Sequence, residues 1–359
     1  MKPDERAPKP SGFFVLRTPL LAFDVFERWA AGLKAPFASE PAALEAALAE
    51  DRARLRRGLA DALERPEARE ALFVASPSLF GSLDPWHRDP AGEQGQKVER
   101  ALVRYFARMC SRPTPFGLFA GCTVGELGSE TSLALGPLDE ARRHTRLDND
   151  YLLTLAEALA RDPKVRAAVP HVPNTSLFAL AGKWRYAEGR RVDETRDYHL
   201  VTFDRSPALD ATLARAAKGA RPDALVRDLV ASEGVTEDEA RAFVEALIAS
   251  RLLTPSLEPP VTGVEPIYDL LGQLRDVPSA APTVEVLGQV RRELEALDQR
   301  PLGEDVRTYQ RLADALGALP APVELSRLFQ LDLMKPAPLR LGPAVMTQVQ
   351  RGLGILQRI

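Results

Sequence analysis

Residues 111–121 read Ser-Arg-Pro-Thr-Pro-Phe-Gly-Leu-Phe-Ala-Gly, and no other stretch of this sequence is so specific. Arginines recur every four residues up to this stretch: Arg100, Arg104, Arg108 and Arg112. Residues four apart lie one above another on a helix, so the guanidinium groups should form a stripe along one helix face. Pro113 and Pro115 disfavour helical geometry in the residues before them, so we expect the helix to stop at Arg112. A stiff turn would then hold Arg112 and Thr114 beside the stripe.

The arginine stripe has two interpretations. Charge runs often only keep a helix surface solvated. Like charges stacked along one face also repel each other, and the planar guanidinium group suits phosphate oxygens, so a phosphate-rich partner would stabilise such a stripe. The proline-rich turn at its end favours the second interpretation, because it would fix further polar side chains at one place.

The composition is that of an ordinary folded protein with a sizeable core. The chain has 359 residues, 45% of them hydrophobic, and a net charge of -3 that conceals 47 lysines and arginines. Any nucleic-acid surface must therefore be a local patch. With only two cysteines, Cys110 and Cys122, no leader pattern and no apolar run of membrane-spanning length, a cytoplasmic protein without a membrane span is expected.

Several kinds of site are not indicated. The four histidines are scattered without ligand spacing, and two thiols without clustered histidines make a poor zinc site, so no metal is expected. Gly117 and Gly121 lack the Gly-Lys-Ser or Gly-Lys-Thr of a phosphate loop, and no serine lies in a nucleophile elbow. Neither ATP, NAD nor another cofactor is implied.

The periodicity predicts an α+β protein with mixed helices and sheets. Apolar and turn residues place the first elements as follows: a strand at 13–17, a helix at 40–64, a loop at 78–95, the arginine helix, a strand at 118–124 and a helix from Asp148 to Leu159. Asp148 is a suitable cap for that helix. Later elements are a helix at 284–298, a strand at 326–333 and a final helix from Pro343.

Residues 176–257 form a module of their own in this prediction. Three short strands, at 177–180, 184–187 and 198–202, precede helices that begin at Ser206, Pro222 and Thr236. Thr236 and Glu239 make a capping-box pattern. The order is that of a winged helix-turn-helix, but the acidic third helix would repel a phosphate backbone. An extended peptide added to the edge of the sheet suits it better.

The sequence resembles the N-terminal glutamylation domain of class I lanthipeptide dehydratases. The resemblance rests on residues 108–121, on Arg-Leu-Asp at 146–148 and on Phe-Phe-Val-Leu-Arg-Thr-Pro-Leu at 13–20. It implies transfer of glutamate from glutamyl-tRNA to serine and threonine hydroxyls of a ribosomal precursor peptide. Elimination of that glutamate by a second domain then gives dehydroamino acids. The resemblance therefore implies no cofactor, and it implies glutamyl-tRNA as a co-substrate.

The resemblance also implies which residues act. Those at matching positions for glutamylation are Arg17, Arg112, Thr114, Asp148 and Asp332, and those for tRNA binding are Arg104, Arg108 and Arg112. Arg17 would pair with the glutamate carboxylate or a phosphate, and Thr114 would donate to a phosphate or to the carbonyl oxygen. Asp148 would either accept the hydroxyl proton or hold an arginine in place. We favour the second role, because neighbouring arginines lower a carboxylate's pKa.

The predicted module resembles the leader-peptide recognition element of these enzymes, although a plain structural insert is the alternative. Its expected peptide-binding residues are Tyr198, Leu200, Phe203, Phe243 and Leu247. The prediction divides the chain into three parts: 1–175, the first part of the glutamylation domain; 176–257, the module; and 258–359, a continuation truncated at its C-terminus.

The predicted function is therefore glutamyl-tRNA-dependent glutamylation, the first step of dehydration. The later half of the domain and the elimination domain have no counterpart in these 359 residues, so a further domain or a partner chain would have to supply them. The alternative is a non-catalytic protein that binds the leader of a precursor peptide, as a fragment or subunit of a split dehydratase. A homodimer is left open.

Overall fold

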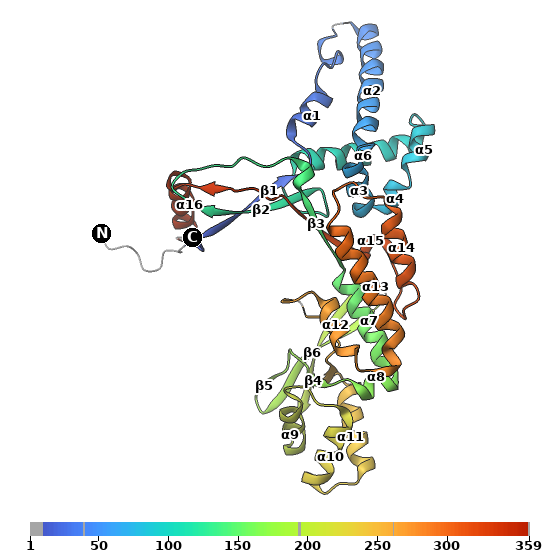
Figure 1. The fold of residues 1–359 in the computed structure, drawn as a ribbon, viewed down its shortest axis with the longest axis vertical. Helices are drawn as coiled ribbons and strands as arrows, with labels where there is room; N and C mark the ends of the chain where they lie inside the picture. Colours follow the sequence, from blue (N-terminus) through green and yellow to red (C-terminus); the bar gives the residue numbers. More distant parts are fainter. Residues whose placement is uncertain (1–9, 39, 193–194, 261, 358–359) are drawn as a thin grey trace, which may run out of the picture. The chain divides into compact units, whose positions relative to one another are not determined.

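The protein has an α+β fold, seen in a computed structural model that describes residues 10–38, 40–192, 195–260 and 262–357 (Figure 1). The chain forms two compact units. Unit 1 comprises residues 1–146, 292–314 and 324–359, and unit 2 comprises residues 147–291 and 315–323. The module expected at 176–257 lies wholly within unit 2, and the expected three-part division of the chain stays a prediction.

Unit 1 is built on a five-stranded sheet. Its strand order is β1 (Phe13–Pro19), β2 (Ala120–Leu127), β9 (Phe329–Met334) and β3 (Arg142–Leu147), with β10 (Arg340–Leu341) also beside β2. β1 runs antiparallel to β2, with Arg17 opposite Cys122, whereas β9 runs parallel to β2. The sheet thus joins the start of the chain to residues more than three hundred positions later.

Unit 1 also contains these helices: α1 (Phe23–Ala30), α2 (Pro41–Leu63), α3 (Pro66–Ala75), α4 (Pro77–Phe80), α5 (Leu83–Arg88), α6 (Glu93–Ser111), α14 (Arg307–Leu316), α15 (Leu325–Leu328) and α16 (Pro343–Leu356). Of these, α6 contacts β1, and α15 contacts β9. The predicted end of the arginine helix is confirmed, since Arg112 leaves the helix with φ −104° and ψ 119°. The prediction of a loop at 78–95 is wrong, because α4 and α5 lie there. Pro77 and Pro85 fall in first turns, where a helix loses little from a missing N–H.

Unit 2 contains a helical part and the predicted module. The helical part has α7 (Asn149–Arg161), α8 (Pro163–Ala168), α12 (Pro266–Leu274) and the two-stranded pair of β4 (His171–Pro173) with β8 (Leu253–Pro255). A long helix, α13 (Ala281–Asp298), continues the chain into unit 1.

The module has the predicted order of elements. A three-stranded sheet, β5 (Phe178–Leu180), β6 (Lys183–Val192) and β7 (Thr195–Asp204), precedes α9 (Pro207–Ala216), α10 (Pro222–Glu233) and α11 (Glu237–Ala249). The Ser206 cap of α9 and the capping box of Thr236 and Glu239 are both present. Leucines of the three helices pack around the buried ring of Tyr186. The winged helix-turn-helix interpretation of this order stays a prediction.

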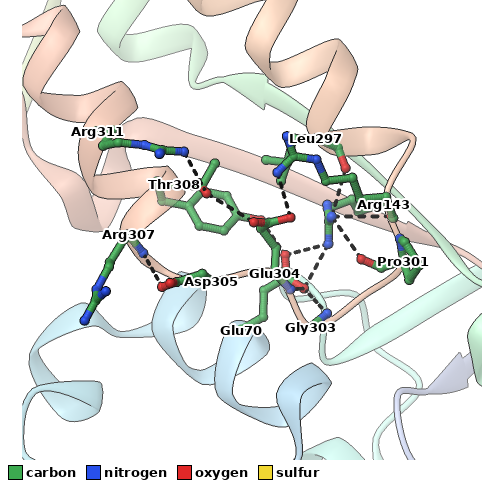
Figure 2. Close-up of polar contacts among 12 residues, drawn as sticks. Glu70, Arg143, Leu297, Pro301, Gly303, Glu304, Asp305, Arg307, Thr308 and Arg311 are labelled. Atoms are coloured by element: carbon green, nitrogen blue, oxygen red, sulfur yellow. Dashed lines mark hydrogen bonds and ion pairs between the residues drawn. The ribbon is translucent and has the colours of Figure 1, made fainter.

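A fully buried ion pair holds β3 in unit 1 (Figure 2). Arg143 donates from Nη1 to both carboxylate oxygens of Glu70, at 2.7 and 2.9 Å, and neither side chain is exposed. Its Nη2 donates to the carbonyls of Leu297 and Pro301, at 2.8 and 3.1 Å. The Glu70 carboxylate also accepts the hydroxyl of Tyr309 at 2.6 Å.

The loop after α13 closes this network. Gly303 donates its backbone N–H to Glu70 at 2.6 Å, and it has a φ of +95°. A Cβ atom at this position would lie 2.5 Å from the Cβ of Pro66, so glycine is required both for the conformation and for the close approach. The network therefore joins α3, β3 and the loop before α14.

Candidate functional site

The arginine stripe of α6 is exposed over most of its length. Arg104 and Arg112 are exposed, and in the described part of the chain their guanidinium groups have no hydrogen-bond or ion-pair partner. Arg108 is half-buried, and its guanidinium lies over the ring of Phe116, 4.4 Å from the centroid. Charged groups without a protein partner are available to a ligand, which agrees with the interpretation as an anion-binding surface.

Two backbone hydrogen bonds fix β1 beside the end of the stripe. Leu21 donates its N–H to the carbonyl of Met109 in the last turns of α6, at 2.9 Å, and Leu20 donates to the carbonyl of Phe119 at 2.8 Å. Arg17 lies three residues earlier on β1, exposed and without a described partner. The structure thus brings Arg17 into the same unit as the stripe and ties its strand to the stripe's helix.

The proline-rich turn is anchored by aromatic rings. Phe119 is fully buried, and its ring lies 5.3 Å from that of Tyr105 and 5.7 Å from that of Phe116, in edge-on contacts. Gly117 has a φ of +52°, a conformation that glycine adopts easily. Thr114 is exposed, with its hydroxyl open to a partner. The turn therefore presents Thr114 and Arg112 from a backbone held on both sides.

Lys335 is a basic residue of this region that the sequence did not reveal. It follows β9, and its ammonium donates to the carbonyl of Pro19 and, at 3.3 Å, to that of Leu20. Burial lowers the pKa of Lys335 to about 8. Together with Arg28 it lines a cavity of about 530 Å³ at the end of β1. No motif marks this lysine, because its partners are backbone carbonyls far away in the sequence.

The two acidic residues predicted for the site, Asp148 and Asp332, lie in different units and have different partners. Asp332 on β9 forms an ion pair with Nη1 of Arg146 on β3, at 2.8 Å. Asp148 belongs to unit 2 and caps α7, where its Oδ1 accepts the N–H of Asp150 at 2.8 Å. The capping role of Asp148 is confirmed, whereas the part that Asp148 and Asp332 take in glutamylation stays a prediction.

The expected peptide-binding residues divide into an exposed and a buried group. β7 is the last strand of its three-stranded sheet, and its Tyr198 and Leu200 are 69% and 62% exposed. Phe203 and Phe243 are partly buried against the module's core, and Leu247 is buried within it. An incoming strand could thus contact Tyr198 and Leu200, while Leu247 supports the fold of the module.

No group of three or more histidine, cysteine or acidic side chains that could hold a metal ion occurs among the described residues. Both cysteines are free, and burial raises the pKa of Cys110 to about 11, which agrees with a packing role. Within the same residues, no helix is both long and apolar enough to cross a membrane.

Residues 64–359 match the family described as "Lantibiotic dehydratase, N terminus". The chain belongs to this family. Among curated relatives, it is 19% identical to the epidermin biosynthesis protein EpiB of Staphylococcus epidermidis, over 70% of this chain and 25% of that protein. It is 20% identical to the subtilin biosynthesis protein SpaB of Bacillus subtilis, over 74% of this chain and 25% of that protein. The chain thus spans about a quarter of the length of these relatives.

Two solved structures share the fold. The tRNA-dependent lantibiotic dehydratase MibB of Microbispora matches 95% of this chain and 30% of its own with a TM-score of 0.69 at 24% identity. The glutamylation domain of TbtB from thiomuracin biosynthesis, bound to 5'-phosphodesmethylglutamycin, matches 96% of this chain and 51% of its own with a TM-score of 0.60 at 17% identity. The predicted family and fold class are both confirmed.

Proposed function

We propose that this lantibiotic dehydratase chain carries the tRNA-binding part of a glutamylation domain, which transfers glutamate from glutamyl-tRNA to serine and threonine hydroxyls of a precursor peptide. Membership in the family and the likeness to the TbtB glutamylation domain support the reaction class. The observation that carries the proposal is the set of guanidinium groups of Arg17, Arg104 and Arg112, which are exposed and have no partner among the described residues.

The contrast with other arginines of unit 1 strengthens this point. Arg56 on α2 forms an ion pair with Glu99 on α6 at 2.5 Å, and Arg28 pairs with Asp24 at 2.5 Å. Acidic side chains of unit 1 therefore form ion pairs with arginines outside the stripe. A set of unpaired arginines on a rigid helix and its adjoining strand suits the phosphates of an RNA acceptor end, which such groups bind in a bidentate manner.

The proposed transfer exchanges one ester for another. The hydroxyl oxygen of serine or threonine bonds to the glutamyl carbonyl carbon, the bond from that carbon to the tRNA ribose oxygen breaks, and the hydroxyl proton ends on the ribose oxygen. Because both bonds join carbon to similar oxygens, positioning and charge stabilisation matter more than a strong nucleophile. Arg112 and Thr114 would hold a phosphate or the developing oxyanion, and Arg17 the glutamate carboxylate or a further phosphate.

The module would hold the precursor's leader peptide. β7 lies at the edge of its sheet, so its outer backbone groups are available for an added strand, and Tyr198 and Leu200 lie on the exposed side. The exposed edge of β7 also supports the second candidate function, which is leader-peptide binding without catalysis. In this proposal the chain binds glutamyl-tRNA and the precursor peptide. The remaining half of the glutamylation domain and the elimination domain are supplied by a further domain or by a partner chain.

Binding of glutamyl-tRNA at several salt concentrations tests the arginine surface. Arg112→Ala should weaken binding and reduce the slope of log K against log salt by about 0.7–0.9, the contribution of one phosphate contact. Arg227→Ala is the matched control, because Arg227 is an exposed arginine on α10 in the other unit. Equal affinities and slopes for Arg112→Ala and the wild type would refute the role of the stripe.

A second assay separates the two candidate functions. In a reaction supplied with the rest of a dehydratase, Arg112→Ala should abolish glutamylation and leave leader-peptide binding nearly unchanged. Leu200→Asp should weaken leader-peptide binding and leave tRNA binding unchanged, because it places a charge on the edge strand β7 and changes no residue of the stripe. A chain that binds leader peptide but supports no tRNA-dependent transfer would favour the peptide-binding function.

A further inference from the structure

Lys335 connects three strands of the sheet in unit 1. It directly follows β9, and its backbone N–H donates to the carbonyl of Cys122 on β2 at 2.9 Å. Its own carbonyl accepts the hydroxyl of Thr123, also on β2, at 2.6 Å. The side chain extends to β1, where the ammonium donates to the carbonyls of Pro19 and, at 3.3 Å, of Leu20. Because β2 lies between β9 and β1, this residue links two strands that do not pair with each other.

These contacts surround Arg17 on β1. Arg17 lies opposite Cys122 in the register of β1 and β2, and Cys122 is the residue that accepts the backbone N–H of Lys335. The carbonyls that the ammonium holds belong to Pro19 and Leu20, which follow Arg17 closely in the sequence. Within the described sheet, β1 is an edge strand that pairs with β2 alone. Lys335 therefore restrains the free end of the strand that carries Arg17.

The same stretch of backbone leads to the arginine stripe. Leu20, whose carbonyl accepts from Lys335, donates its own N–H to Phe119 in the proline-rich turn at 2.8 Å. Leu21 donates to a carbonyl in the last turns of α6 at 2.9 Å. A displacement of Leu20 would thus change where Arg17 lies relative to the turn and to the stripe.

Packing alone does not explain a lysine at this position. Lys335 is half-buried, and in the described part of the chain its ammonium has no carboxylate partner. Asp24 lines the same cavity, but it pairs with Arg28 at 2.5 Å. Removing a charge from water without a counter-ion is costly, and this cost lowers the pKa of Lys335 to about 8. The cavity beside it has a volume of about 530 Å³, so close packing does not hold the side chain either. What the ammonium gains is its hydrogen bonds to β1.

We propose that Lys335 is a positioning residue of the glutamylation site, which holds Arg17 in place beside Arg112 for the anionic groups of glutamyl-tRNA. This inference rests on the proposed function of the arginine stripe. Lys335 acts through Arg17: its ammonium fixes the backbone, and the guanidinium of Arg17 contacts the phosphate or the glutamate carboxylate. Methionine at position 335 would fill a similar space but leave the two carbonyls without a donor, whereas arginine would keep both charge and donors.

Binding of glutamyl-tRNA to the full chain tests this inference, with the ester replaced by an amide so that the probe stays intact at high pH. Lys335→Met and Arg17→Ala should each raise the dissociation constant about tenfold, the effect of one lost charge-assisted hydrogen bond. Lys335→Met should cause no further loss in the Arg17→Ala background, because both changes remove the same contact. Lys335→Arg should recover most of the affinity. Lys164→Met, at an exposed lysine on α8, is the matched control and should have no effect.

A pH series gives a readout that a purely structural role would not change. The affinity of the wild type should fall severalfold as the pH rises through about 8, because the amine of Lys335 then loses its charge. Lys335→Arg should show no such fall. The other titratable side chains that line the cavity are Arg28, Arg65, Asp24 and Cys110, and this variant keeps them all, so it controls for their titration. The comparison needs only the wild type and Lys335→Arg, so it decides the question even where Lys335→Met is unstable.

Several results would overturn the inference. One is wild-type affinity in Lys335→Met or in Arg17→Ala, and another is the same pH profile in the wild type and in Lys335→Arg. A further loss from Lys335→Met in the Arg17→Ala background would show that Lys335 does not act through Arg17. Arg112→Ala separates these failures from that of the proposed function: if it weakens binding, only the role of Lys335 is refuted, and if it does not, the arginine stripe is refuted as well.

Discussion

Arg143 and Arg112 lie in the same unit of the protein, yet their surroundings are opposite. Arg143 is fully buried, and it donates to a carboxylate and to several carbonyl oxygens. Arg112 ends the stripe of α6 in solvent, without a partner in the described part of the chain. An arginine whose partners are all within the protein maintains the fold, and one whose donors are left open is available for binding. The two groups should therefore respond to mutation in opposite ways.

The largest expected effect is the loss of the buried arginine. Arg143→Ala leaves the carboxylate of Glu70 buried without its cation, so the free energy of unfolding of unit 1 should fall by about 3–5 kcal/mol. Urea denaturation followed by tryptophan fluorescence would report it, since Trp29 and Trp86 both lie in this unit.

Two further variants sharpen this result. Arg142→Ala, at the exposed neighbouring position, should change stability by no more than about 0.5 kcal/mol. The pair Glu70→Gln with Arg143→Met removes both charges and should recover part of the loss, because no buried ion is left unpaired. If Arg143→Ala were as stable as Arg142→Ala, the proposed division between structural and available arginines would fail.

Acidification tests burial in unit 2, where the titrating group is a histidine without an ion-pair partner. The pKa of His171 is about 4 in the folded chain and about 6.5 in the unfolded chain, so the unfolded chain binds more protons between these values. Stability is therefore intact above pH 6.5 and should fall by about 3 kcal/mol as the pH drops to 4.

Hydrogen exchange of the β4 and β8 amides would follow this loss within unit 2. His171→Gln should remove most of the pH dependence, and His199→Gln, at an exposed position, should leave it unchanged. Charged groups that line a pocket beside His171 would modify the curve: Arg161, Arg166, Arg251, Glu157, Glu245 and Glu258. Protection that stayed constant between pH 7 and 4 would show that His171 is not buried as a neutral ring.

A smaller effect should come from the edge of the buried network. Tyr309 donates to Glu70 at 2.6 Å, and burial together with that carboxylate raises the pKa of Tyr309. Tyr309→Phe removes one hydrogen bond to a charged acceptor that keeps its other donors, so a loss of about 1.5–3 kcal/mol is expected from denaturation. A loss as large as that of Arg143→Ala would mean that the hydroxyl, and not the guanidinium, dominates the network.

The sequence predicted the local features of this protein better than the distant ones. The end of α6 at Arg112 and the capping box of Thr236 are confirmed, because prolines and caps act within a few residues. The exposed stripe could be foreseen from its spacing. The same residue types misled at 78–95, where Pro85 lies in the first turn of α5 and does not prevent that helix.

Other features could not be foreseen because their partners are far apart along the chain. The Glu70 and Arg143 pair, the contact of Lys335 with β1 and the pairing of Asp332 with Arg146 all depend on how the strands of unit 1 are ordered. A single sequence does not reveal which of 47 basic residues is buried beside which carboxylate. The candidate site was thus predictable where it follows one helix and its turn, and unpredictable where it depends on the sheet.

The smallest expected effect completes the comparison. Arg112→Ala should change the free energy of unfolding by no more than about 0.5 kcal/mol, because an exposed side chain without a protein partner contributes little to stability. Removing one of several like charges on α6 could even stabilise the helix slightly. Denaturation at low salt, where such repulsion is least screened, is the sensitive measurement. A stability loss of several kcal/mol would show that Arg112 has a structural partner, and the weaker RNA binding of this variant would then have to be attributed to unfolding.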